Sequence, residues 1–283
     1  MATIGSRQKR VIVTADDFGA ALEVNHAVER AHRDGILTAA SLMVTGDAAD
    51  DAVARARSMP GLGVGLHIVL VEGRPALPPG QLPDLVDGSG QFRRDMVLTA
   101  IGIFAKPAAR AQLCAEVEAQ FMRFAATGLP LDHVNAHKHF HLHPTIASTI
   151  LSVGRRHGMK AIRAPIEPGD VLNQIEPGSG RFDIARPWAT LVRRRMRRAG
   201  LLVPDQVFGL AWSGALDTKR LRGLIENLPQ GLTEIYAHPA TGPYSGSAPG
   251  YAYAEELAAL TDSLAKQRVL RDGVALGRFA DFV

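Results

Sequence analysis

Short apolar runs alternate with longer amphipathic segments along most of the chain. The first run, RVIVTA, is rich in β-branched residues, as buried strands are. Seven further runs are strand-like. The eight predicted strands are residues 10–15, 36–45, 62–70, 133–140, 160–165, 206–211, 233–240 and 274–279.

The segments between these runs carry apolar residues at helical spacing. The predicted helices are residues 20–35, 47–59, 108–127, 144–158, 187–199, 216–228 and 252–267. Strands that alternate with helices imply a parallel sheet with crossover helices. No GxGxxG follows the first strand, so the pattern favours an irregular TIM-like (β/α) barrel of parallel strands over a dinucleotide-binding sheet. We expect one domain over residues 1–283.

Two segments depart from this alternation. Residues 73–92 are rich in proline and glycine and predict a long loop, which we hypothesise to close over a substrate. Helix 187–199 is basic and amphipathic, with Trp188, Leu191, Val192 and Met196 near one face and arginines elsewhere. It is either an ordinary barrel helix with a solvated basic face or a peripheral contact with an anionic membrane surface.

Composition narrows the class of protein. The hydrophobic share of 46% and charged share of 21% are ordinary for a globular chain of 283 residues. The net charge of +4 is concentrated in the arginine-rich helix, and no aromatic-interleaved basic patch is present, so we do not expect nucleic acid as the main partner. The single cysteine, Cys114, excludes an internal disulfide and fits a reducing compartment.

The beginning of the chain bears on location. MATIGSRQKR leads into an apolar run of only a few residues, which is too short for a signal peptide. We expect a cytoplasmic protein. Peripheral contact with the inner face of the membrane and formation of a homodimer stay open.

An acidic pair ends the first predicted strand, in TADDFG. Catalytic groups of α/β barrels lie at the carboxyl ends of strands. Asp16 and Asp17 would repel each other there unless a cation or a proton intervenes. One of them can bind a metal while the other acts as a base. The alternative is that one simply caps the next helix.

Five of the ten histidines fall within DHVNAHKHFHLHP, residues 132–144. They are His133, His137, His139, His141 and His143. Because they alternate with other residues, a strand would point them all to one face. Such a cluster favours metal binding or proton transfer over a surface histidine run.

Three single residues complete the candidates. His67 lies in the apolar run GLHIVL, and His238 and Arg163 lie near the ends of later runs. Each can instead be a hydrogen-bonded structural residue. One carboxylate and two histidines form a common ligand set for a divalent metal with an open position. A second carboxylate can then take a proton from water, and a histidine on the opposite side can protonate the leaving group, which together describe hydrolysis of an amide or ester.

In this order, TADDFG, GLHIVL, the HxHxH core of NAHKHFHLHP and YAHP resemble the motifs of the YdjC-like carbohydrate deacetylase family. The correspondence extends from about residue 10 to the end of the chain. Three longer phrases, SLMVTGDAADDAVARA, LVEGRP and LDHVNAHKHFHLHP, are more similar to the members associated with hopanoid biosynthesis.

The resemblance implies an irregular (β/α) barrel, one divalent metal ion, magnesium or zinc, and removal of acetyl from an N-acetylated amino sugar of the N-acetylglucosamine type, possibly lipid-linked through a hopanoid. By motif position, Asp17, His67 and His137 match metal ligands, Asp16 the catalytic base, His238 the acid, and His139, His141 and Arg163 supporting or substrate-binding residues. Many members have Asp-Ser where this chain has Asn135-Ala136. If the aspartate of those members orients a ligand histidine, Asn135 must do so as a neutral partner.

Other functions compete with this one. They are a soluble chitooligosaccharide deacetylase, a metal-dependent phosphoesterase or sugar isomerase on the same scaffold, and a non-catalytic metal- or sugar-binding protein. A single clear acidic pair favours a one-metal amide hydrolase, since the other enzymes often hold more carboxylates or two metals. Asp16 and His238 argue against a protein that only binds.

Overall fold

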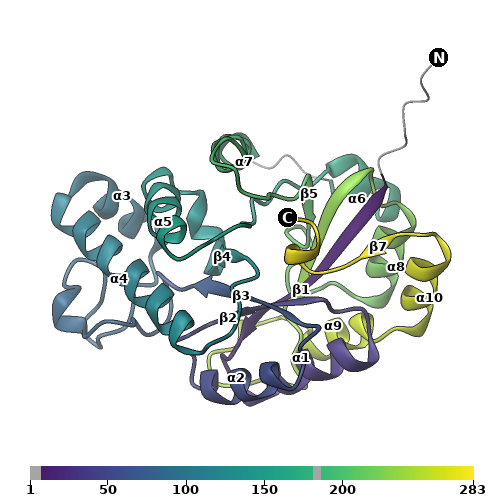
Figure 1. The fold of residues 1–283 in the computed structure, drawn as a ribbon, viewed down its shortest axis with the longest axis horizontal. Coiled ribbons are helices and arrows are strands. Elements are labelled where there is room, and N and C mark those ends of the chain that lie inside the picture. The colour runs from purple at the N-terminus through teal and green to yellow at the C-terminus, as the bar shows by residue number, and fades with distance from the viewer. Residues whose placement is uncertain (1–7, 181–185) are drawn as a thin grey trace.

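Parallel strands form the centre of the molecule in the computed structural model, which describes residues 8–180 and 186–283. Within these residues the strands are β1 (Lys9–Phe18), β2 (Ala39–Leu42), β3 (Gly63–Ile68), β4 (Val134–Ala136), β5 (Gln206–Phe208), β6 (Gly231–Ala237) and β7 (Ala275–Leu276). They pair in the order β4-β3-β2-β1-β6-β5, and β7 pairs with β1. The sheet curves into a half-barrel (Figure 1), which confirms the irregular TIM-like barrel.

The predicted strand at 160–165 is not a regular strand. Only single parallel bridges form there, between Ile162 and Val134 of β4 and between Ala161 and Leu202. Further along, the Ile166 carbonyl accepts the N–H of Val207 in β5. The segment therefore bonds to both edge strands, but Pro165 has no N–H and the ladder cannot continue through it.

Helices surround the sheet (Figure 1). They are α1 (Leu22–Asp34), α2 (Ala49–Arg57), α3 (Met96–Ala105), α4 (Pro107–Ala126), α5 (Pro144–Arg156), α6 (Gly169–Ile175), α7 (Arg186–Arg198), α8 (Thr218–Glu226), α9 (Tyr253–Leu260) and α10 (Ser263–Arg271), with short 3-10 turns η1 (Pro79–Gln81), η2 (His137–Leu142) and η3 (Phe279–Asp281). The helix predicted at 252–267 is divided into α9 and α10, because the Asp262 side chain accepts the N–H of Ala265 and caps a new helix. Helices α3 and α6 were not predicted.

The loop at 73–92 is packed against α4. The buried carboxylate of Glu116 accepts the backbone N–H groups of Ala76 and Leu77 at 2.7 and 3.0 Å. Phe92, at the end of the loop, is fully buried and donates its N–H to Gly73. Closure of this loop over a substrate stays a prediction.

The apolar face predicted for helix 187–199 is partly wrong. In α7, Val192 and Met196 are buried together with Ala189, but Trp188 and Leu191 are each 54% exposed. With 3.6 residues per turn, the buried arc centres on positions 189, 192 and 196, and the other two side chains fall outside it.

A single domain over residues 1–283 stays a prediction, and residues 1–7 and 181–185 of it lie outside the described residues. Among the helices of the described residues, none combines the length and hydrophobicity that crossing a bilayer requires.

Candidate active site

An irregularity at the end of β1 lets two adjacent acids face one site. The register pairs Ala15 with Ala40 but Phe18 with Leu42, so β1 carries one extra residue at this point. Asp17 has a left-handed backbone with φ of 62°. Neighbouring side chains of a regular strand would point to opposite faces, and the bulge removes that constraint. Helix α1 begins without a side-chain cap, so neither acid has the alternative capping role.

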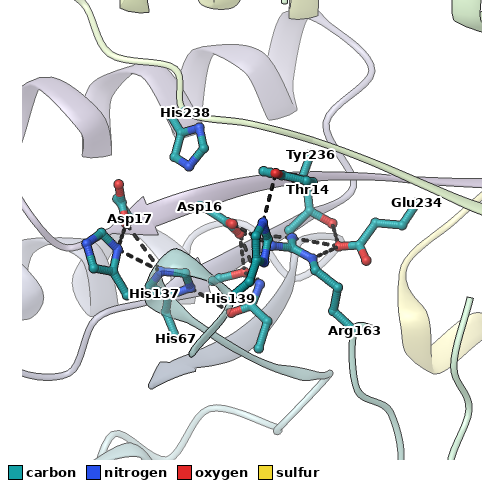
Figure 2. A network of polar contacts seen from close by, with 12 residues as sticks. Thr14, Asp16, Asp17, His67, His137, His139, Arg163, Glu234, Tyr236 and His238 are labelled. Atoms are coloured by element: carbon teal, nitrogen blue, oxygen red, sulfur yellow. Dashed lines mark hydrogen bonds and ion pairs between the residues drawn. The ribbon is translucent and has the colours of Figure 1, made fainter. Parts of the chain in front are cut away.

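Asp17 lies at one corner of a nearly equilateral triangle of metal-ligating atoms (Figure 2). Its Oδ1 is 3.3 Å from His67 Nε2 and 3.3 Å from His137 Nδ1, and the two nitrogens are 3.4 Å apart. Two ligands about 2.1 Å from a tetrahedral ion would be about 3.4 Å apart. Asp17 Oδ1 is buried yet has no hydrogen-bond partner within residues 8–180 and 186–283. These residues therefore fit a single divalent cation.

Asn135 fixes the orientation of His67. The register of β3 and β4 pairs the two residues, and Asn135 Oδ1 lies 2.6 Å from His67 Nδ1. The amide nitrogen donates to Asp16 Oδ1 and Ser41 Oγ, so its oxygen must face the histidine. His67 Nδ1 then carries the proton and Nε2 directs its lone pair at the triangle, as a metal ligand requires.

The histidine segment does not share one face, contrary to the prediction from its alternation. Strand β4 ends at Ala136, and η2 follows, with Lys138 and His139 in left-handed conformations at φ of 52° and 54°. The chain turns there, so successive side chains no longer alternate between two faces as they would on a strand. Only His137 of this segment reaches the triangle.

His139 and His141 lie deeper, beside Arg163. His139 Nε2 is 2.9 Å from the Tyr236 hydroxyl, and His141 Nε2 is 3.0 Å from the Arg163 carbonyl. Burial and the Arg163 charge hold the pKa of His139 well below its usual value and lower the pKa of His141 to about 3. Both rings are therefore neutral at physiological pH, which suits hydrogen bonding and excludes them as charged acids.

The two outer histidines of the segment lie outside the triangle. His133 is buried behind the site, 3.0 Å from both Asp132 and Ser41, and it stacks on Phe279. His143 directly precedes α5, where burial lowers its pKa. The contacts of His133 are those of a structural residue, whereas His143 Nδ1 is buried without a hydrogen-bond partner among the described residues.

Asp16 is held by a buried arginine (Figure 2). Arg163 donates from Nη1 to Asp16 Oδ2 at 2.5 Å and from Nη2 to Asp16 Oδ1 at 3.0 Å. Its Nε and Nη2 also donate to Glu234 Oε1 at 3.0 and 2.7 Å. Burial raises the pKa of Asp16, but the charge and hydrogen bonds of Arg163, together with the charges of His67 and His238, outweigh burial and hold that pKa far below its usual value. Asp16 is thus ionised throughout the physiological range.

Sequence reasoning missed several members of this network, among them Ser41, Glu234 and Tyr236. Ser41 Oγ donates to Asp16 at 2.9 Å, Glu234 shares Arg163, and the Tyr236 ring lies 4.3 Å from the Arg163 guanidinium carbon. The period-two spacing of Glu234 and Tyr236 on β6, continued by His238 directly after the strand, was the available signal, because alternate residues of a strand point the same way.

Removing the arginine should destabilise the protein. Arg163→Met leaves Asp16 and Glu234 as two uncompensated buried carboxylates, and we expect the free energy of unfolding to fall by about 3–5 kcal/mol. Urea denaturation measures this. Adding Glu234→Gln to Arg163→Met removes one of the two charges and should recover part of the loss; no recovery would contradict the charge argument.

His238 approaches from the other side of the acids. Figure 2 shows His238 and His67 on opposite sides of Asp16 and Asp17. The His238 backbone N–H donates to buried Glu256 at 2.5 Å, and its ring contacts Tyr251. His238 Nδ1 is buried without a hydrogen-bond partner among the described residues, so it can form a hydrogen bond with a bound molecule. The site therefore places an ionised carboxylate and an imidazole around a candidate metal position.

The profile of YdjC-like proteins matches residues 10–271. The chain belongs to the YdjC-like family. This YdjC-like chain is 32% identical to a carbohydrate deacetylase of Geobacillus stearothermophilus over 276 residues, covering 96% of this chain and 97% of the relative. It is 28% identical to a chitooligosaccharide deacetylase of Serratia marcescens, covering 97% and 99%.

A solved structure shares the YdjC-like fold. It is described as a putative cellobiose-phosphate cleavage protein from Enterococcus faecalis, with a TM-score of 0.76 and 23% identity, covering 98% of this chain and 99% of that one. At this identity the likeness establishes the barrel and leaves the chemistry to the site itself.

Proposed function

We propose that the chain is a metal-dependent carbohydrate N-deacetylase that hydrolyses the acetamide of an N-acetylglucosamine-type sugar. The observation that carries the proposal is the triangle of Asp17, His67 and His137 beside ionised Asp16. The names of relatives that match almost the whole chain, carbohydrate and chitooligosaccharide deacetylases, support the same reaction class.

One carboxylate and two imidazoles suit a divalent ion, for which we propose magnesium or zinc. Such an ion would polarise the acetamide carbonyl and acidify a bound water. The same ligand set would also serve a protein that only binds metal or sugar, so the acid–base residues distinguish catalysis from binding.

In the proposed reaction Asp16 accepts a proton from water as a C–O bond forms at the acetyl carbon. Arg163, Asn135 and Ser41 hold the Asp16 carboxylate in place, and in the part of the chain that the structure describes Asp16 Oδ2 has Arg163 as its one hydrogen-bond partner. His238 donates a proton to the sugar nitrogen as the C–N bond breaks. The products are acetate and the free amino sugar.

Acetate release from di-N-acetylchitobiose, measured with added Mg²⁺ or Zn²⁺, tests the reaction class. We expect one acetate and one new primary amine per turnover. Binding of the sugar without any acetate would favour a non-catalytic sugar-binding protein. Release of phosphate or isomerisation of a sugar, with no acetate, would favour the other enzymes of this scaffold.

We further propose that the sugar is carried by a hopanoid lipid. Support comes from the phrases shared with members associated with hopanoid biosynthesis, such as LVEGRP, and from the basic helix α7 with exposed Trp188 and Leu191. N-acetylglucosaminyl bacteriohopanetetrol should then be deacetylated with a higher kcat/KM than di-N-acetylchitobiose. A preference for chitobiose would instead support a chitooligosaccharide deacetylase.

A further inference from the structure

Helix α3 exposes a charge-free apolar face. Four large apolar side chains, spread over about two turns, are each 58–69% exposed: Val97, Leu98, Ile101 and Phe104. With 3.6 residues per turn they fall within an arc of about 120°. A contiguous apolar patch of this kind marks an interaction surface more often than an ordinary solvated face.

The opposite side anchors the helix to the protein. Thr99 and Ile103 are buried, and Met96 and Ala100 pack against the hydrophobic core. At the start of α3, the Asp95 side chain accepts the N–H groups of Val97 and Leu98. The apolar face is therefore presented by a formed, capped helix, and its exposure does not come from poor packing.

Basic side chains flank α3 at both ends. Arg93 and Arg94 precede it, and Lys106 and Arg110 follow it, all exposed. The acids near these ends are already engaged, because Asp95 caps the helix and Asp84 binds Lys106 at 3.0 Å. The surroundings of the apolar face are thus net positive.

Helix α3 lies in the same connection of the chain as a residue that contacts the histidine turn. This connection begins directly after Ile68, the last residue of β3, and leads through α3 to α4. Near its start, Glu72 pairs with Lys138 at 2.6 Å, directly beside His137. Figure 1 shows α3 at one end of the long axis of the molecule. The same connection therefore carries both Glu72 and α3, with α3 beginning 28 residues after Ile68, the last residue of β3.

We propose that α3 docks on an anionic lipid bilayer, with its apolar face among the acyl chains and its basic ends on lipid phosphates. A helix of 10 residues is about 15 Å long, which suits the interfacial plane and not a crossing. A second copy of the chain fits less well, because parallel or antiparallel pairing of two α3 helices would bring basic ends together. This inference rests on the proposed function in its lipid-linked form, and it adds the lipid bilayer as the partner that α3 binds.

Vesicle flotation tests the surface. The wild type should float with vesicles of phosphatidylcholine and phosphatidylglycerol, less with phosphatidylcholine alone, and less at high salt. The variant Ile101→Ser/Phe104→Ser should bind the anionic vesicles at least tenfold more weakly. Leu270→Ser is the matched control, since Leu270 of α10 is 73% exposed, and it should bind like the wild type.

Three results would overturn the proposal. They are wild-type protein that does not float with anionic vesicles, an α3 variant that floats like the wild type, and a wild-type dimer that Ile101→Ser/Phe104→Ser converts to a monomer. The last would show that a second copy covers α3. No sugar is needed in these measurements, so their failure leaves deacetylation of di-N-acetylchitobiose untouched, and failure of deacetylation leaves vesicle binding untouched.

Discussion

Substituting Asp16 with asparagine should lower kcat for acetate release by about 10²–10⁴-fold, the usual contribution of a positioned general base. The amide cannot accept the proton of the attacking water. The metal triangle does not include Asp16, so the variant should retain its metal. Steady-state acetate release, together with metal analysis of the same sample, checks both parts.

The fold should survive this change, because Glu234 remains as a counter-ion for Arg163. Asp205→Asn is a suitable control. Asp205 pairs with Arg197 and accepts the N–H of Leu232, away from the site, so this variant should lose stability without a comparable loss of kcat. Near-normal acetate release by Asp16→Asn would show that Asp16 is not the base.

Removing a metal ligand should have the second large effect. His67→Ala deletes one corner of the triangle and should weaken metal affinity by more than about 100-fold, with a parallel loss of activity at limiting metal. Competition with a coloured chelator measures the affinity.

A graded control comes from the residue behind that ligand. Asn135→Ala leaves all three ligands but removes the hydrogen bond to His67 Nδ1, so we expect a smaller loss of about 10–100-fold. Equal affinities for wild type and His67→Ala would place the metal elsewhere. A greater loss in Asn135→Ala than in His67→Ala would contradict the assigned order of ligand and support.

The fold could be predicted because a (β/α) barrel requires strands and helices to alternate along the chain, and both have recognisable patterns of apolar residues. Apolar runs such as residues 10–15 and 62–70 are buried on both faces, so each reads clearly as a strand. The strand predicted at 160–165 does not form as a regular strand, because Pro165 lacks the N–H that would continue the hydrogen-bond ladder. The division of the predicted helix 252–267 also has a local cause, the capping side chain of Asp262. A capping aspartate inside an apolar pattern is a weak signal in the sequence.

The candidate site was only partly accessible from the sequence. Its members are close in space but distant along the chain, as in the contact of Arg163 with Glu234, 71 residues apart. The histidine turn could not be foreseen either, since lysine and histidine seldom adopt positive φ. Tertiary contacts accompany that conformation, namely Lys138 with Glu72 and His139 with Tyr236.

The most direct test of the account is the metal dependence of amide hydrolysis. The protein would be stripped with a chelator and titrated with Zn²⁺ or Mg²⁺ while acetate release from di-N-acetylchitobiose is recorded. We predict no acetate from the stripped protein and activity that rises to a plateau at one bound metal ion per chain, with no such rise in His67→Ala. Full acetate release from metal-free wild-type protein would contradict the account.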